Sequence, residues 1–223
     1  MAQIARSLLS QSAKDYVRRA VASGSYPGES RVSISAVARE LDISPTPIRE
    51  GLVQLVAEGF LQQLPNRGFH VLPLCLREVA DLYPIGAALE ELGLRASPLP
   101  APDQLAKLRC LNSRMHEDLG KDPEKLILHN QAWHRLLLER CGNRQLIKMM
   151  AQLRARTFRY EYVCYAFDQA EFAGQIGMHE KILGALQLGD RDGAAAVLEQ
   201  HWQENLELVV SVGESIFAQP DHE

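Results

Sequence analysis

The sequence has few cysteines and does not pair them. Cys75, Cys110, Cys141 and Cys164 are far apart among 223 residues and form no CxxC motif, which argues against a disulfide framework and against a cysteine zinc site. No apolar run approaches the roughly 18 residues of a membrane-spanning helix. The N-terminal stretch "MAQIARSLLSQSAKDYVRRA" interrupts its apolar positions with charge, unlike a signal peptide. We therefore predict a cytoplasmic protein with no membrane partner.

The sequence also lacks a strong net charge, but its charges are unevenly distributed. The formal net charge is −4, and residues 1–75 hold eight Lys and Arg against six Asp and Glu, whereas the remaining residues hold sixteen against twenty-two. These balances, +2 and −6, fit a mildly basic part that contacts a polyanion and an acidic part that does not. Differences of this size occur by chance, so motifs must decide the function.

Hydrophobic periodicity predicts a mostly α protein with one β-hairpin. A first helix is expected over residues 3–23, and Ser33 and Ser44 are candidate N-caps of a short second helix and of a third helix that ends near Gly59. The apolar runs that flank "PNRG", 60–64 and 69–73, predict a hairpin. Three helices followed by a hairpin are the order of a winged helix-turn-helix.

Beyond this hairpin, nearly every segment has helical periodicity. The predicted helices cover residues 77–96, 102–118, 123–140, 144–166, 168–188 and 191–213, and the short breaks between them favour an antiparallel six-helix bundle. We therefore predict two domains, a winged helix-turn-helix over residues 1–74 and an all-helical domain over residues 75–223; the resemblances given below imply DNA binding for the first and effector binding and dimerisation for the second.

The third helix and the hairpin carry side chains suited to DNA. A helix-turn-helix presents the start of its second helix to base edges, and hydroxyls there hold phosphates. In "SPTPIRE", Ser44 and Thr46 suit phosphate oxygens, and the planar fork of Arg49 suits guanine O6 and N7. Arg67 at the hairpin tip suits a minor groove, where Gly68 permits close approach of the backbone. A lone arginine is more often a solvated charge, and both hydroxyls could be caps, so the prediction depends on the ordered combination.

Residues 34–74 resemble the winged helix-turn-helix of the GntR family of bacterial transcription regulators. The resemblance rests on "SPTPIRE", on the "L..L..EGFL" spacing and on the "NRGF.V" wing. It implies a homodimer that binds a palindromic operator in double-stranded DNA, with Arg49 and Arg67 as contacts, and we place Ser35 in the same DNA-binding set. Pro45 stands where an arginine often reads a base in this family, which leaves fewer direct base readers.

The helical remainder resembles the FCD ligand-binding domain of the FadR subfamily, through "LYPIGAALE", "HNQAWHRLLLERCGN" and "MHEKILGALQLGDRDGAAAVLEQHW". In many members an aspartate, a histidine four residues later and two histidines of the last two helices hold a divalent metal, and a small carboxylate effector lies over it. The resemblance places these histidines at His134, His179 and His201, and three imidazoles suit zinc, nickel or similar ions. Asn130 takes the aspartate position and shares a helix face with His134, whereas His129 is expected to face elsewhere.

Two features of the sequence oppose this metal and effector site. Three histidines in a helical domain are more often surface or hydrogen-bonded core residues, and Asn130 brings no negative charge to a metal. Gly86 stands where many relatives carry an arginine that could hold a carboxylate. Arg156, Arg159 and Tyr160 are candidate effector contacts in its place, although such arginines could equally face solvent.

The combination predicts a ligand-responsive transcription repressor and not an enzyme. A three-histidine metalloenzyme is an alternative, but the sequence has no HExxH-like motif, and Glu180 beside His179 is expected to face another way. The other alternative is a DNA-binding dimer whose effector pocket has decayed, which Asn130 and Gly86 both favour.

Overall fold

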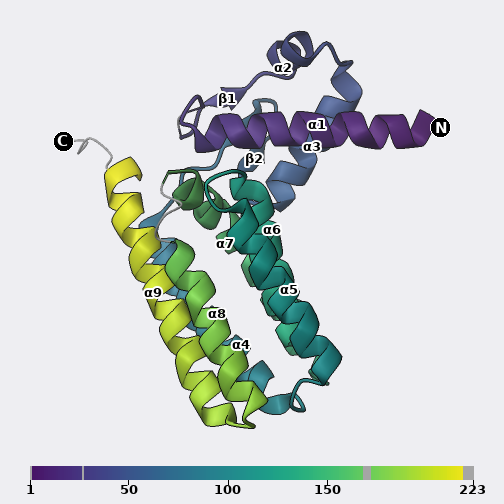
Figure 1. Ribbon diagram of the computed structural model, residues 1–223. Coiled ribbons are helices and arrows are strands. Elements are labelled where there is room, and N and C mark those ends of the chain that lie inside the picture. The colour runs from purple at the N-terminus through teal and green to yellow at the C-terminus, as the bar shows by residue number, and fades with distance from the viewer. Residues whose placement is uncertain (1, 27, 168–171, 218–223) are drawn as a thin grey trace. The chain divides into compact units, whose positions relative to one another are not determined.

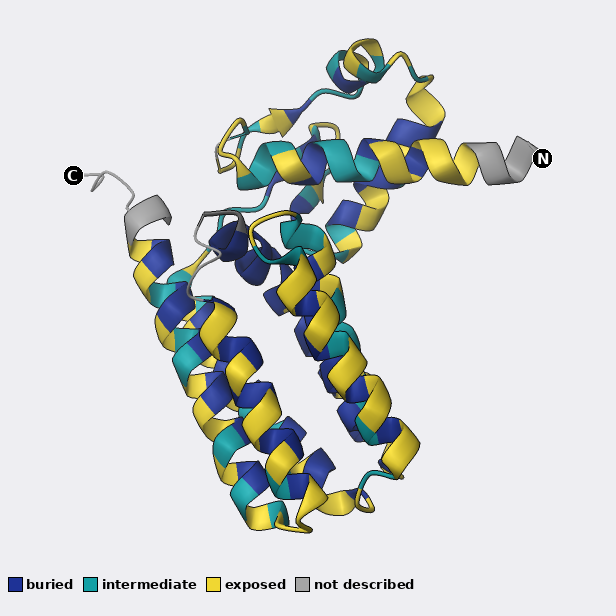
Figure 2. Ribbon diagram, viewed as in Figure 1, coloured by how far each residue is buried: buried dark blue, intermediate teal, exposed yellow. Residues whose placement is uncertain are grey.

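The computed structural model describes residues 2–26, 28–167 and 172–217. The chain divides into two compact units, Met1–Leu74 and Cys75–Glu223, which we call the N-terminal and C-terminal units. Each unit buries its own apolar side chains, as the dark blue segments of Figure 2 show. Within the described part of the chain, no helix is long and apolar enough to cross a membrane.

The N-terminal unit combines helices with a small antiparallel sheet. Its elements are α1 (Ala2–Ala22), β1 (Arg31–Val32), α2 (Ile34–Leu41), α3 (Pro45–Ala57), β2 (Leu61–Leu64) and β3 (Gly68–Val71), and the strand order is β1-β3-β2 (Figure 1). The predicted hairpin is formed by β2 and β3, with Gln63 opposite Phe69. Strand β1 was not predicted, because a two-residue strand has no periodicity and is defined only by its pairing with β3.

Helix caps define the turn between α2 and α3. The Ser33 hydroxyl accepts a 3.3 Å hydrogen bond from the Ala36 amide, and Asp42 ends α2 in the left-handed region with φ 53°. Ser44 occupies the N-cap position of α3, and Pro45 follows in the first turn, where a missing amide hydrogen does no harm. The Ser44 side chain makes no capping hydrogen bond, so its exposed hydroxyl is available to another partner.

Helices α1 and α3 approach most closely at Gly51. A Cβ atom at this position would lie 2.6 Å from the Ser10 carbonyl oxygen and 3.0 Å from the Lys14 amide nitrogen. Both neighbours are backbone atoms of α1, so they cannot move aside as a flexible side chain would. Only glycine allows α3 to bury Ile48 and Leu52 against α1 at this separation.

We expect Gly51→Ala to destabilise the N-terminal unit by about 1–3 kcal/mol, the usual range for overpacking a core. The control is Gly184→Ala, because Gly184 is exposed in a helix and no atom lies within 4 Å of its Cβ position. That change is expected to be neutral or to stabilise by up to about 1 kcal/mol. Calorimetry of the two variants measures both effects, and an unchanged transition in Gly51→Ala would show that α1 and α3 are not in close contact.

The C-terminal unit is a helical bundle. Its described helices are α4 (Leu76–Ala96), α5 (Pro102–Asp118), α6 (Pro123–Leu137), α7 (Arg144–Phe167), α8 (Phe172–Gln187) and α9 (Arg191–Phe217). Helix α4 packs against α7 and α9, α5 packs against α6 and α8, and α6–α7 and α8–α9 contacts close the ring (Figure 1). Buried faces point inward and exposed faces outward (Figure 2). The predicted fold class, a winged helix-turn-helix followed by a helical bundle, is confirmed.

The helix ends differ slightly from the sequence prediction. Helix α6 ends at Leu137 rather than at residue 140, and α9 extends to Phe217 rather than to residue 213. The expected start of the preceding helix, at residues 168–171, lies outside the described residues.

Candidate functional site

The N-terminal unit exposes the residues predicted to contact DNA. Ser44, Thr46 and Arg49 are exposed on the first turns of α3, and Arg67 is exposed at the tip of the β2–β3 hairpin. Gly68 follows with φ 84°, a conformation that glycine adopts without strain.

A groove of this unit brings part of the predicted set together. Ser35, Arg49 and Gly68 line it, and Arg31 and Gln63 line it as well. Arg31 was missed by the sequence reading because it lies on β1, the strand that no local pattern indicated. The groove therefore joins the start of α3 to the wing.

The arginines of this surface are not paired with acidic residues in the part of the chain that the structure describes. Arg31, Arg49 and Arg67 form no ion pair with any residue that the structure describes, whereas basic residues of α1 do, such as Lys14 with Glu58 at 3.0 Å. Exposed guanidinium groups without internal partners can bind phosphate oxygens or guanine edges.

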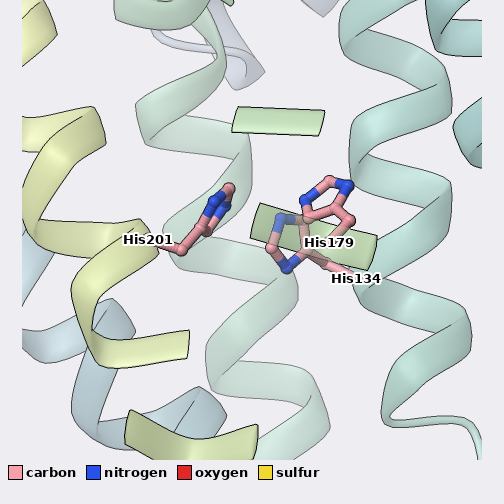
Figure 3. Close-up of side chains that lie close together, drawn as sticks. All are labelled: His134, His179 and His201. Carbon is pink, nitrogen blue, oxygen red and sulfur yellow. The ribbon is translucent and has the colours of Figure 1, made fainter. Parts of the chain in front are cut away.

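The C-terminal unit gathers three histidines in its interior. His134 of α6, His179 of α8 and His201 of α9 are buried, and their potential ligand atoms lie within 4.8 Å of one another. Figure 3 shows the three imidazoles approaching from separate helices. Trp133 stacks on His179 with ring centroids 3.8 Å apart and an interplanar angle of 7°. Helix packing thus unites residues that are 67 positions apart along the chain, from 134 to 201.

Neighbouring side chains orient two of these rings. His134 Nδ1 lies 2.9 Å from Glu90 Oε1, and His179 Nδ1 lies 3.1 Å from Asn112 Oδ1. Because a carboxylate and an amide oxygen only accept, both Nδ1 atoms donate, and both Nε2 atoms keep their lone pairs. Asn112 is itself held, because its amide group donates to Glu180 Oε1 at 2.6 Å. Such outer partners commonly orient histidines that bind metals.

All three histidines are neutral at neutral pH. Burial lowers the pKa of His134, His179 and His201 well below the usual value, and the nearby charge of Arg154 lowers each further. The contact between His134 and Glu90 is therefore a hydrogen bond from a neutral ring rather than an ion pair. Neutral imidazole is the form that binds divalent metals.

Several buried atoms at this site have no hydrogen-bond partner. Within the described residues, His179 Nε2, His201 Nδ1 and Asn130 Oδ1 are all enclosed and unpartnered. Leaving a buried polar atom unsatisfied is costly. Three neutral imidazoles fit a divalent cation such as zinc or nickel, and Asn130 lies one helical turn before His134 on α6, on the same helix face. His129 lies apart from this set and contacts Asp118 at 2.8 Å.

A cavity of about 600 Å³ lies between α6 and α7 and adjoins His134, one of the three histidines. Glu90, His134 and Arg154 line its inner end, and its remaining walls are mostly apolar, including Leu138 and Met150. Gln131 also lines it and keeps a buried Nε2 that no described residue binds. The cavity can therefore hold an organic molecule with an apolar body and a polar group directed toward the histidines.

The sequence-predicted effector contacts lie elsewhere in the unit. Arg156, Arg159 and Tyr160 all bind Glu78 near the start of α4, and none of them lines the cavity. Although partial burial acts in the opposite direction, hydrogen bonds from Tyr160 and Arg156 and the charge of Arg159 hold the pKa of Glu78 below its ordinary value. Their role as effector contacts stays a prediction, and their position gives it no support.

Family models decide the class of the protein. The model of the FCD domain matches residues 81–204, and the model of the bacterial regulatory proteins of the gntR family matches residues 9–71. This chain is a GntR-family regulator. Its FCD domain assigns it to the FadR-like subfamily, and the matched families are transcription regulators rather than enzymes.

Individual GntR-family relatives align over most of the chain. The Nta operon transcriptional regulator of Aminobacter aminovorans is 26% identical over 187 residues, which cover 83% of this chain and 87% of the relative. The HTH-type transcriptional regulator McbR of Escherichia coli is 27% identical over 186 residues, which cover 82% and 84%. The solved structure of E. coli McbR/YncC superposes with a TM-score of 0.70 at 25% identity and covers 92% of this chain and 98% of that one.

The sequence reading missed three residues of this regulator's site. Glu90 stands in the quoted "LYPIGAALE" and Arg154 lies two residues before Arg156, but no local pattern indicated that either side chain is buried. Trp202 follows His201 directly. A helical-wheel reading that placed Arg154 and Glu161 on one face, seven residues apart, would have indicated a polar interior.

Proposed function

We propose that this GntR-family protein is a ligand-responsive repressor that binds a palindromic operator as a homodimer. The observation that carries the proposal is the groove of the N-terminal unit, where Arg31 and Arg49 adjoin the wing and form no ion pair with any described residue. Relatives whose names call them repressors support the direction of control; one is GlaR of Escherichia coli, which is 21% identical over 198 residues. Binding to the chromosome would place the protein in the cytoplasm.

Footprinting tests the DNA-binding part of the proposal. The probe is the DNA upstream of the protein's own gene at low salt, where phosphate contacts are strongest. We expect a protected palindrome with half-sites about one helical turn apart, as a two-fold dimer requires. Uniform binding without a protected site would contradict the proposal.

An apolar stripe on α4 supports a dimer. Ile85 and Leu92 lie seven residues apart on one helix face and are 50% and 54% exposed, and the exposed Pro84 and Ala88 extend the stripe. Apolar side chains grouped on one face usually mark a protein interface. The occupant we propose is the same stripe of a second copy, because a two-fold interface is self-complementary.

We expect Ile85→Glu combined with Leu92→Glu to give a monomer and to weaken operator binding about tenfold or more, since each half-site would then bind alone. The control is Leu188→Glu, because Leu188 is 86% exposed but stands apart from the stripe. Sedimentation velocity and gel shifts measure the two effects. A double variant that remains a dimer would place the interface elsewhere.

We further propose that His134, His179, His201 and Asn130 hold a divalent metal in the C-terminal unit. A metal there would act as a Lewis acid that binds an oxygen of the effector. The effector we propose is a small carboxylate with an apolar body in the 600 Å³ cavity. Arg154 and Gln131 support this class, because Arg154 Nε and Nη1 and Gln131 Nε2 have no partner among the described residues.

Thermal-shift screening of organic acids, with and without a chelator, tests the effector. A ligand at about 100 times its Kd stabilises a protein by about 2.7 kcal/mol, so an acid that binds gives a clear shift. We expect the chelator to abolish that shift. If no acid and no metal shifts the transition, the C-terminal unit only dimerises, which is the decayed-pocket alternative.

Replacing Asn130 by aspartate tests the fourth metal position. We expect Asn130→Asp to raise zinc affinity about tenfold, because it adds a negative charge to an oxygen ligand. Without metal the variant should melt at a lower temperature than the wild type, because the introduced carboxylate is then buried without a cation to pair with. A zinc titration and melting curves with and without zinc measure these opposite effects. No gain in affinity would mean that position 130 does not face a metal.

A further inference from the structure

Glu90 is a fully enclosed carboxylate in the interior of the C-terminal unit. Its side chain is 0% exposed, and it accepts hydrogen bonds from three helices. His134 Nδ1 lies 2.9 Å from Oε1, Arg154 Nη2 lies 2.9 Å from both oxygens, and Trp202 Nε1 lies 2.7 Å from Oε2. A carboxylate buried this deeply is tolerated only when its oxygens are satisfied by well-placed donors, so all three partners are held to one place.

One oxygen of Glu90 serves two different sites. Oε1 accepts from both His134 and Arg154. The second nitrogen of the His134 ring, Nε2, is the one left for the histidine cluster. Arg154 lines the neighbouring cavity. Any movement of His134 toward a metal, or of Arg154 toward a ligand in the cavity, therefore changes the same pair of bonds.

Gly86 explains why the third donor can reach Glu90. A Cβ at position 86 would lie 2.5 Å from the Trp202 ring, so any other residue would push the indole away. With glycine there, Trp202 donates to Glu90 and its ring lies 5.1 Å from the Arg154 guanidinium carbon, within range of a cation–π contact. The indole packs against the Arg154 guanidinium group, which also lines the cavity.

We propose that Glu90 is a positioning residue that couples the histidine site to the cavity. The inference rests on the metal site proposed above and adds the route by which metal and effector influence each other. Glu90 is not one of the proposed metal ligands, and it lines the cavity beside Arg154. It sets the orientation of His134 for the metal and of Arg154 for the ligand, so occupation of one site favours the arrangement that the other requires.

Chemical rescue tests this role. Glu90→Ala removes the carboxylate and leaves three aligned donors around a space of the size of acetate. We expect the variant to bind Zn²⁺ about 10- to 100-fold more weakly than the wild type, the usual effect of losing a group that orients a metal-bound histidine. Acetate should restore most of this affinity with a saturable dependence, and acetamide, which has the same shape without the charge, should not. The rescue is the gain in Zn²⁺ affinity beyond any acetate response of the wild type, in which Glu90 fills this space while the cavity can still take a carboxylate.

A reciprocal measurement checks the rescue from the side of acetate. If acetate raises the affinity of Glu90→Ala for Zn²⁺, then Zn²⁺ must raise its affinity for acetate by the same factor. Calorimetric titration of acetate with and without Zn²⁺ measures this factor. Equal acetate affinities in both conditions would overturn the coupling.

A second variant covers the case in which Glu90→Ala does not fold. Glu90→Gln keeps the size of the side chain and loses its charge, so we expect about tenfold weaker Zn²⁺ binding and no response to acetate, because the space is filled. Wild-type Zn²⁺ affinity in this variant would overturn the inference while leaving the metal site in place. A wild-type protein that binds no Zn²⁺ would overturn the proposed metal site and the coupling together, and gel shifts would still report on the DNA-binding proposal.

Discussion

Replacing His179 by alanine is expected to abolish tight binding of a divalent metal. His179 would supply one of three imidazoles, so its loss should weaken Zn²⁺ or Ni²⁺ binding more than the roughly 10- to 100-fold effect of losing a group that merely orients a ligand. The remaining His134, His201 and Asn130 would leave two nitrogens and a neutral oxygen, a set that seldom holds zinc. Competition titration against a chelator of known affinity measures the change.

The matched control for this prediction is His129→Ala. His129 lies in the same helix as His134, but its ring contacts Asp118 outside the cluster. We expect unchanged metal affinity in this variant. Equal losses in His129→Ala and His179→Ala would mean that metal binds at the surface rather than in the buried site. Circular dichroism checks that His179→Ala still folds, because this variant also loses the stacking partner of Trp133.

Replacing Arg49 by alanine is expected to give the largest loss of operator affinity among single substitutions in the N-terminal unit. Arg49 is exposed on α3, lines the groove beside the wing and has no ion-pair partner among the described residues. A bidentate contact between arginine and guanine is worth about 1–3 kcal/mol of discrimination. We therefore expect operator affinity to fall about 5- to 150-fold for each half-site contacted, with little change in non-specific binding.

Two variants distinguish this effect from a general loss of positive charge. Lys107→Ala removes a charge from the C-terminal unit, where Lys107 pairs with Asp103, and should leave operator binding unchanged. Arg67→Ala at the wing tip should weaken binding to all sequences and make the salt dependence shallower by about one unit. If Arg49→Ala weakens specific and non-specific DNA equally, Arg49 contacts phosphate and reads no base.

Local sequence patterns were sufficient for the elements and for the histidines. Ser33 and Ser44 mark the starts of α2 and α3 because N-cap preferences act within one turn of helix. The histidine cluster followed from a family resemblance together with the four-residue spacing of Asn130 and His134. The two-residue strand β1 could not be found in this way, because its only definition is a ladder with β3, which lies nearly 40 residues later.

Helix α7 shows why the arginine at the cavity could not be chosen from the sequence. Successive residues of a helix are about 100° apart, so Arg154 and Arg156 face nearly opposite directions although they are close in sequence. The sequence reading chose Arg156 and Arg159, which bind Glu78. It did not consider Arg154, because the buried Glu90 that holds Arg154 comes from another helix and no local pattern indicates this contact.

The chain contains two tryptophans, and both lie at the histidine site. Trp133 stacks on His179, and the indole of Trp202 donates a hydrogen bond to Glu90. Ultraviolet emission from tryptophan therefore originates entirely beside the three imidazoles, and nothing from the DNA-binding unit contributes to it. A paramagnetic ion such as Ni²⁺ at the imidazoles would quench this emission, so the native protein carries its own optical reporter and needs no attached dye.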